Sequence, residues 1–483
     1  MKRLINFICL VIVAQAAYGQ AVFQRSYGGP GNEYGRAVIE CSGGGYLIVG
    51  STNSYYNPST DVYLLRVDEN GDYLWGRNIG ESSKIDWGID LAEDADGNFI
   101  IAGYTDDSPS GSYDGLLIKT DPDGQVIWKK TFGGDDWDFI EGMALNNADE
   151  IVLAGSKTVN GIQKGWVFKT DSDGELIWET LIESSSQLKI TGVDICDDQN
   201  IVFTGFSSNN LLETKTFVVG RISQECEIVW VTNYPEFGQY EASGCVCWEN
   251  FIISIGTKYE SNDYSRINLS SIDLSSGLLQ WMRSLNNPEP NVGLGINVNL
   301  LGNILVAGGI KDIISPDYSA ISFEFNSQGQ DIAAEYAVLQ GSIGEDLFYD
   351  VVPVSDGGYV CVGHSNSFGN NYQVLLSKIG ANGERDLTNT DFLDLATTSN
   401  PQILENEIKI FPNPAQDFIQ VDSEESLNYT FNILGIDGKQ FLDGNIKDQP
   451  DGIAIRSLPS GLFILKLYES GELKSISRFV KLP

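Results

Sequence analysis

The chain has 483 residues, and its 66 acidic residues outnumber its 30 basic residues, which gives a formal net charge of −36. A surface this acidic repels the phosphates of nucleic acids and the headgroups of anionic membranes, and it therefore argues against both as partners. Hydrophobic residues make up 42% of the chain, which is enough for one large core or for a large and a small one.

Residues 1–19 have the composition of a signal peptide. Two basic residues precede an apolar run from Leu4 to Ala14, which is too short to cross a bilayer. Small residues at Ala17 and Gly19 then mark the expected cleavage point. No later stretch has the length and apolarity of a membrane span, so we expect an exported protein without one.

Six cysteines follow this point: Cys41, Cys196, Cys226, Cys245, Cys247 and Cys361. Export permits disulfides, but six cysteines in a chain this long do not form a disulfide-built scaffold. We expect mostly buried thiols with one or two bridges, whose partners the sequence leaves open.

An apolar run that ends in glycine recurs about every fifty residues. The glycines are Gly50, Gly103, Gly155, Gly205, Gly256, Gly308 and Gly363. Most units also carry a tryptophan shortly after a turn, at Trp75, Trp128, Trp178, Trp230 and Trp281. Short apolar runs bounded by turn residues are typical of strands buried on both faces. Four such strands in each of seven units predict a β-propeller.

The start of the chain supports closure of the ring. "FQRSYGG" at 23–29 is similar to "WKKTFGG" at 128–134, whereas the seventh unit ends in the polar "GERDLTN". We therefore expect Phe23 to Tyr27 to complete the last blade, which leaves no exposed sheet edge. The predicted fold is all-β, with a seven-bladed propeller over residues 20–391, closed by this N-terminal strand.

Two stretches resemble known propeller families. "DWGIDLAEDADGNFIIAGYT" at 86–105 is similar to the repeat of bacterial seven-bladed β-propeller proteins, and "IDLSSGLLQW" at 272–281 resembles the tryptophan motif of pyrroloquinoline quinone propellers. The quinone enzymes typically have eight blades and often an adjacent cysteine pair, but here Val246 separates the two cysteines. The resemblance implies an architecture and no particular activity, and we expect no cofactor.

After an expected linker at 392–407, alternating strands and turns predict a small Ig-like β-sandwich over residues 408–483. This segment closely resembles the C-terminal sorting domain of type IX secretion in Bacteroidetes. The matching pieces are Pro412-Asn413-Pro414, Gly438-Lys439, Leu458-Pro459-Ser460-Gly461 and Phe479-Val480-Lys481. An ordinary adhesion-type sandwich is the alternative, because fold alone does not specify function.

The resemblance to the sorting domain implies a route out of the cell. The signal peptide would direct the chain to the periplasm, and the type IX machinery, the implied partner, would carry it across the outer membrane. In that family the domain is usually removed, and the cargo is then released or attached to surface lipopolysaccharide. The expected location is therefore secreted or on the outer cell surface.

The sequence offers little metal or nucleophile chemistry. Its single histidine, His364, excludes histidine-rich metal sites, and we expect it in a polar loop. "KTDPDGQVIW" at 119–128 returns as "KTDSDGELIW" at 169–178. A calcium loop of the EF-hand kind would need a carboxylate at its twelfth position, where Phe132 and Ile182 stand. These stretches are better explained as hairpin turns, and we expect no metal site.

When the repeats are aligned on their glycines, two columns of equivalent positions fall at the expected start of each inner strand, beside the predicted channel mouth. Seventeen residues before each repeat glycine lie Glu33, Asp86, Asp138, Leu188, Gln239, Asn291 and Asp346. The next column contains Tyr34, Trp87, Phe139, Lys189, Tyr240, Val292 and Leu347. Carboxylates beside aromatic rings bind sugars or cations, which makes candidate ligand-binding residues of Glu33, Tyr34, Asp86, Trp87, Asp138, Tyr240 and Asp346. Alternatively, the carboxylates cap turns and the rings pack between blades.

These observations predict a secreted or surface-attached binding or scaffold protein. Its ligand at the channel mouth would be a glycan or a surface protein, and no residue can be named as catalytic. The alternative is a carbohydrate-active hydrolase or lyase that uses carboxylates on the same face.

Overall fold

The computed structural model describes most of the chain in two compact units, Met1–Ala396 and Thr397–Pro483. The described residues are 22–54, 59–81, 83–107, 112–184, 186–209, 214–261, 264–285, 289–311, 317–330, 332, 337–338, 344–367, 371–385, 390–394, 409–411, 415–422, 429–435, 440–448, 452–469 and 472–482. The predicted signal peptide therefore lies outside them. No helix in the described ranges is long and apolar enough to span a membrane.

The described part of the first unit consists of successive antiparallel sheets. The first three sheets contain β2 (Glu33–Glu40), β3 (Tyr46–Thr52), β4 (Asp61–Val67) and β5 (Tyr73–Ile79); β6 (Asp86–Glu93), β7 (Phe99–Thr105), β8 (Asp114–Thr120) and β9 (Val126–Phe132); and β10 (Asp138–Leu145), β11 (Ile151–Val159), β12 (Ile162–Thr170) and β13 (Leu176–Ile182).

The next three sheets repeat this order. They contain β14 (Gln187–Ile195), β15 (Ile201–Asn209), β16 (Thr214–Ile222) and β17 (Ile228–Tyr234); β18 (Tyr240–Trp248), β19 (Phe251–Ser261), β20 (Tyr264–Asp273) and β21 (Leu279–Ser284); and β22 (Asn291–Val298), β23 (Ile304–Lys311), β24 (Tyr318–Phe325) and β25 (Ala337–Val338). A 3-10 turn, η1 (Pro235–Phe237), precedes β18.

The last sheet of this unit combines both ends of the propeller segment. Its order is β26 (Asp346–Pro353), β27 (Tyr359–Ser365), β28 (Gln373–Ile379), β1 (Phe23–Gly28) and β29 (Thr390–Asp394). β1 pairs antiparallel with β28 and parallel with β29. Residues 392–394, which we expected in the linker, therefore lie in a strand of this sheet.

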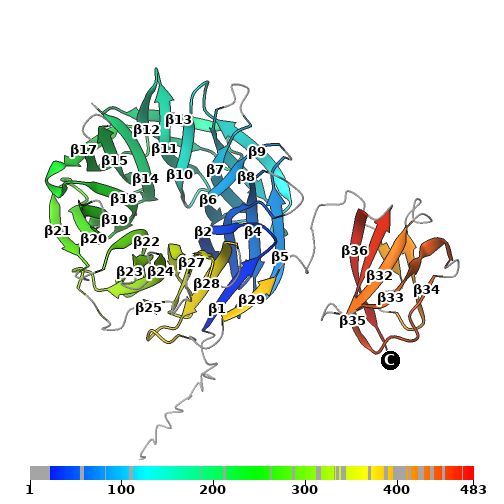
Figure 1. Cartoon of the computed structure of the whole chain (residues 1–483). Coiled ribbons are helices and arrows are strands. Elements are labelled where there is room, and N and C mark those ends of the chain that lie inside the picture. The colour runs from blue at the N-terminus through cyan, green and yellow to red at the C-terminus, as the bar shows by residue number, and fades with distance from the viewer. Residues whose placement is uncertain are drawn as a thin grey trace, which may run out of the picture. The chain divides into compact units, whose positions relative to one another are not determined.

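The sheets of the first unit are arranged in a ring, as the blades of a β-propeller are (Figure 1). The first strand of each sheet, here called the inner strand, packs beside the inner strand of the next sheet, and β26 packs beside β2. The second and third strands are buried on both faces; β3 and β4, for example, have no exposed residue. This burial explains their unbroken apolar sequences.

The repeat glycines are required by a bulge in every inner strand. In the first sheet the register shifts between Gly35 and Ala37, opposite Gly50. A Cβ atom on Gly50 would overlap the carbonyl oxygen of Tyr34. The other repeat glycines make the same close approach to the inner strand of their own sheet. Glycine therefore recurs because the backbones come too close for any side chain.

The Asp-Gly stretches form tight turns, as predicted. Asp121 accepts hydrogen bonds from the amides of Asp123 (3.0 Å) and Gln125 (2.8 Å), and Gly124 adopts a φ of 77°. The carboxylate of Asp121 is thus engaged by its own turn.

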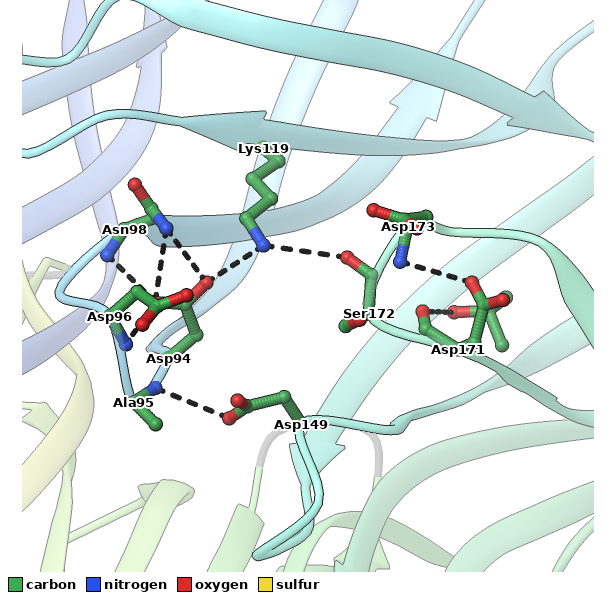
Figure 2. Close-up of polar contacts among 10 residues, drawn as sticks. Asp94, Ala95, Asp96, Asn98, Lys119, Asp149, Asp171, Ser172 and Asp173 are labelled. Carbon is green, nitrogen blue, oxygen red and sulfur yellow. Dashed lines mark hydrogen bonds and ion pairs between the residues drawn. The ribbon is translucent and has the colours of Figure 1, made fainter.

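The lysine before this turn connects two sheets (Figure 2). Lys119 of β8 forms an ion pair with Asp94 at 2.8 Å and donates a hydrogen bond to the carbonyl of Ser172 in the next sheet at 3.4 Å. Lys169 repeats the arrangement with Glu150 (2.9 Å) and a carbonyl of the following sheet. We call each such lysine, with its acidic partner and the carbonyl of the neighbouring sheet, a basic latch.

One disulfide joins neighbouring sheets among the described cysteines. Cys196, which directly follows β14, is bonded to Cys247 of β18. Cys41 and Cys361 are buried thiols, as expected, whereas Cys226 and Cys245 are half-buried.

The second unit contains two antiparallel sheets around one core. The first has β30 (Lys409–Phe411), β31 (Phe418–Asp422) and β34 (Ile453–Ala454); the second has β33 (Gln440–Asn445), β32 (Thr430–Gly435), β35 (Gly461–Glu469) and β36 (Glu472–Lys481). Ile419 from the first sheet and Ile433 and Leu465 from the second belong to the same buried cluster.

The structure describes only part of the predicted sorting motif. Pro412, Asn413, Pro414, Gly438 and Lys439 lie outside the described residues. Gly461 begins β35 and Lys481 ends β36, where the Lys481 side chain is buried. A parallel bridge pairs Ala415 with Lys481, so the chain just after the Pro-Asn-Pro sequence lies beside the last strand.

Candidate functional site at the channel mouth

The acidic residues of the first predicted column are buried where the inner strands begin. Glu33, Asp86, Asp138 and Asp346 are each at most 1% exposed. Glu33 accepts hydrogen bonds from the Gly29 amide at 2.8 Å and the Thr52 hydroxyl at 2.9 Å. Asp138 accepts one from the Thr158 amide at 2.8 Å. These contacts hold the loops at the ends of the strands, as turn-capping carboxylates do.

Asp86 and Asp346 have the same placement. Asp86 faces the Lys129 amine at 3.4 Å, and Asp346 accepts a hydrogen bond from the Ser367 hydroxyl at 2.8 Å. Burial raises the pKa of Asp138 and of Asp346 above the ordinary value. The four carboxylates therefore present little surface to a ligand.

Tyr240 does not face the mouth. It is fully buried, with its ring 4.8 Å from that of Phe217. In the first sheet Gly50 pairs with Gly35, and the same spacing would pair Gly256 with Glu241. In the structure Gly256 pairs with Ala242 instead. Glu241 therefore takes the mouth position in this sheet, and Tyr240 takes the buried one.

Tyr34 and Trp87, near the start of the inner strands β2 and β6, belong to a longer series of aromatic rings. We call this series the aromatic arc: Tyr372, Tyr34, Trp87, Tyr104, Phe139, Tyr113 and Trp137. Successive ring centres are 5.2, 6.1, 6.2, 5.1, 5.7 and 5.7 Å apart. Six of the rings are half-buried, and Trp137 is 58% exposed. The arc thus keeps ring surface accessible across several neighbouring sheets.

Sequence reasoning missed four members of the arc. Tyr113 and Tyr372 stand directly before the third strands of their sheets, Trp137 precedes β10, and Tyr104 lies in β7. An aromatic residue that recurs just before the third strand, at Tyr113 and Tyr372, was the available signal. The contacts of these rings across neighbouring sheets were not readable from a linear sequence.

His364 lies in β27 and is 4% exposed, which corrects the predicted loop position. Its ring packs against Tyr34 (5.2 Å), Tyr372 (4.9 Å) and Tyr349 (5.3 Å). Burial, assisted by the charge of Arg36, lowers the pKa of His364 to about 3. The histidine is therefore neutral at physiological pH and packs against two rings of the arc, Tyr34 and Tyr372.

The inner strands enclose a cavity of about 560 Å³ that reaches the arc at Tyr104. Its charged lining includes Arg36, Asp90, Glu141, Lys189, Glu241 and Asp350. Lys189 and Glu141 form an ion pair at 2.6 Å, and Glu241 pairs with Lys215. The cavity lining therefore combines charged groups with the aromatic rings of Tyr104, Phe206 and Tyr349.

Asp90 and Asp350 bridge neighbouring inner strands in this cavity. Asp90 accepts hydrogen bonds from the amides of Leu91 and Met143, both at 2.8 Å. Asp350 accepts from the amides of Val351 (2.8 Å) and Val38 (3.0 Å). Burial raises the pKa of Asp90 to about 7, with a further rise from the charge of Asp350, and burial raises the pKa of Asp350 to about 6.

These raised pKa values predict that the protein loses stability as the pH rises from about 4, the ordinary value of the carboxyl group, to about 7. Because the folded state holds the proton of Asp90 more tightly than the unfolded state, its contribution is favourable at low pH and is lost as the pH rises through the folded-state pKa. The free energy of unfolding should fall by up to about 1.4 kcal/mol per pH unit for each such proton. Urea unfolding across this range should show a shallower pH dependence in Asp90→Asn than in the wild type; equal slopes would contradict the prediction.

Residues 409–481 match the family described as the secretion system C-terminal sorting domain. This match confirms the predicted sorting domain, and the chain is accordingly exported by type IX secretion to the cell surface or the medium. A comparison with curated proteins finds no match.

Solved structures with similar folds are distant in sequence. PorZ, an essential bacterial surface component of the type IX secretion system of Porphyromonas gingivalis, is 10% identical with a TM-score of 0.34, over 91% of this chain and 69% of that one. Puromycin hydrolase is 12% identical with a TM-score of 0.46, over 79% and 57%. The β-propeller domain of the trilobed protease from Pyrococcus furiosus is 10% identical with a TM-score of 0.43, over 74% and 95%. At these TM-scores we draw nothing further from the three.

Proposed function

We propose that this chain is an exported glycan-binding protein without catalytic activity, whose binding surface is the aromatic arc at the mouth of a seven-bladed propeller. The pairing of β1 with β28 and the contact of β26 with β2 support a ring of seven blades closed by the N-terminal strand. The two sheets around one core in the second unit support an Ig-like sandwich.

The aromatic arc is the observation that carries the proposal. Sugar rings have apolar faces that stack on aromatic side chains, and their hydroxyl groups need polar partners nearby. The rings of the arc keep accessible surface, and acidic groups border it; Glu345 accepts a hydrogen bond from the hydroxyl of Tyr372 at 3.0 Å. A row of separate sugar units fits such a surface, because successive ring centres of the arc are more than 5 Å apart.

The experiment is a glycan array followed by titration of the glycans that bind. Trp87→Ala combined with Trp137→Ala should weaken binding about tenfold, since each lost stacking contact costs about 0.5–1.5 kcal/mol beyond the buried area. Ile127→Ala is the control, because Ile127 is 52% exposed on β9, outside the arc. An unchanged Kd in the tryptophan double variant, with an unchanged melting temperature, would refute binding at the arc.

A carbohydrate-active enzyme is the second candidate, supported by the pair Asp90 and Asp350 in the cavity. Two carboxylates with raised pKa values can serve as acid and base in glycoside hydrolysis. Both carboxylates, however, already accept two backbone hydrogen bonds each, and we therefore place binding first. Polysaccharide turnover that disappears in Asp90→Asn would favour the enzyme.

The remaining steps of export belong to the same proposal. The signal peptide at 1–19 would deliver the chain to the periplasm, and removal of the second unit at the surface would leave the propeller released or attached to lipopolysaccharide. In either form the arc would be available to extracellular glycans.

A further inference from the structure

Arg36 stands where the cavity meets the aromatic arc. It is the bulged residue of β2 and lines the cavity. Its guanidinium carbon lies 4.1 Å from the centre of the Tyr349 ring. That ring packs on His364, which in turn contacts Tyr34 and Tyr372 of the arc. Stacking on Tyr349 holds the plane of the guanidinium in one orientation.

Arg36 lacks the acidic partner that its surroundings would suggest. In the part of the chain that the structure describes, Arg36 forms no ion pair, and its buried Nε has no hydrogen-bond partner. The other basic residue of the cavity lining, Lys189, is paired with Glu141. Although acidic residues outnumber basic ones 66 to 30 in this chain, this guanidinium is left unmatched.

The nearby carboxylates of the cavity are committed elsewhere. Asp90 and Asp350 direct their oxygens to backbone amides of the inner strands, and Glu241 pairs with Lys215. A planar guanidinium with free donors binds a carboxylate through two parallel hydrogen bonds. Arg36 therefore has both the charge and the geometry to receive a carboxylate from outside the protein.

We propose that the ligand at the mouth is an acidic glycan whose carboxylate binds Arg36 while neighbouring sugar rings stack on the aromatic arc. This inference rests on the proposed glycan-binding function and specifies its ligand class. Because the net charge of −36 repels polyanions, the fitting ligand has few acidic groups, such as a short oligosaccharide with a uronic acid beside neutral sugars.

The test is calorimetric titration of the full chain with a short uronic-acid oligosaccharide and with its carboxyl-reduced, neutral counterpart at fixed salt. Arg36→Gln should weaken binding of the acidic oligosaccharide by about tenfold or more, because hydrogen bonds to charged groups are among the stronger ones. Binding of the neutral counterpart should stay the same. Arg36→Lys keeps the charge but lacks the planar guanidinium, so it should bind the acidic oligosaccharide more tightly than Arg36→Gln and less tightly than the wild type.

The outcomes separate this inference from the function on which it rests. If Arg36→Gln binds the acidic oligosaccharide as the wild type does, while the Trp87→Ala/Trp137→Ala variant loses it, the role of Arg36 is overturned and glycan binding stands. If the neutral counterpart binds the wild type as tightly as the acidic one, or a sulfated one binds better, the carboxylate preference is overturned. If no glycan binds the wild type, both proposals fail. Equal melting temperatures of the variants show that the fold is intact.

Discussion

Replacement of Cys196 and Cys247 by alanine should lower the free energy of unfolding of the first unit by about 4 kcal/mol. The bond links residues 51 positions apart. In the chain-entropy model, closing a loop of this length lowers the conformational entropy of the unfolded chain, and this destabilises the unfolded state by about 4 kcal/mol. The bridge also joins the residue that follows inner strand β14 to inner strand β18 of the neighbouring sheet. Urea unfolding of the oxidised wild type and of the double variant measures the difference.

Two controls accompany this experiment. Cys226→Ser alters a half-buried thiol outside the disulfide and should leave the unfolding midpoint nearly unchanged. Reduction of the wild type should reproduce the loss seen in the double variant. A double variant within 1 kcal/mol of the wild type would show that contacts between the sheets, and not the bond, hold this junction.

Replacement of Lys119 by methionine should cost about 3–5 kcal/mol, because it leaves a buried charge without its partner. The Asp94 side chain is 3% exposed and that of Lys119 is 12% exposed. Methionine retains most of the apolar stem of lysine but neither the ion pair nor the hydrogen bond to Ser172 (Figure 2). Lys119→Met therefore removes one contact within the sheet that contains β8 and one contact between this sheet and the next.

The pH dependence identifies the cause of this loss. Burial raises the pKa of Asp94, but the hydrogen bonds from Lys119 and Asn98 outweigh burial and hold it below its ordinary value. In the wild type the pair therefore stabilises the fold above the unfolded-state pKa, and this contribution is lost as the pH falls through the folded-state pKa. The difference between Lys119→Met and the wild type should accordingly be larger at pH 7 than at pH 4.

A matched control lies on the neighbouring strand. Lys130 forms an ion pair with Glu175, whose side chain is 76% exposed, so Lys130→Met should cost no more than about 1 kcal/mol. Adding Asp94→Asn to Lys119→Met should recover part of the loss at pH 7, because the stranded charge is removed. Equal effects of the two lysine variants would contradict the basic latch.

Much of the fold was readable from the sequence because it is repeated or local. Glycines at Gly50 and its equivalents, with an apolar run before each, predicted the four-stranded units and their order. The likeness of residues 23–29 to a fourth strand correctly predicted that β1 pairs with the last sheet. The turn at Asp121 could also be distinguished from a calcium loop, because Phe132 stands where such a loop needs a carboxylate.

The candidate site was only partly readable. Tyr34 and Trp87 are half-buried members of the aromatic arc, but the carboxylates of the adjacent column are buried in the loops they cap. Tyr240 was displaced because one hairpin has a different register, and a register difference of one residue sends a side chain to the opposite face. His364 was predicted in a loop, but it lies directly after Gly363 in strand β27.

The sequence by itself determined the architecture and the route of export, because a spacing of fifty residues and an ordered set of terminal motifs are properties of the linear chain. Only the tertiary structure decided which distant side chains become neighbours. The disulfide partner of Cys196, the carbonyl that Lys119 reaches, the continuity of the aromatic arc and the unmatched charge of Arg36 all depend on contacts between residues of neighbouring sheets. Such contacts depend on packing between sheets, which the spacing of residues along one chain does not encode.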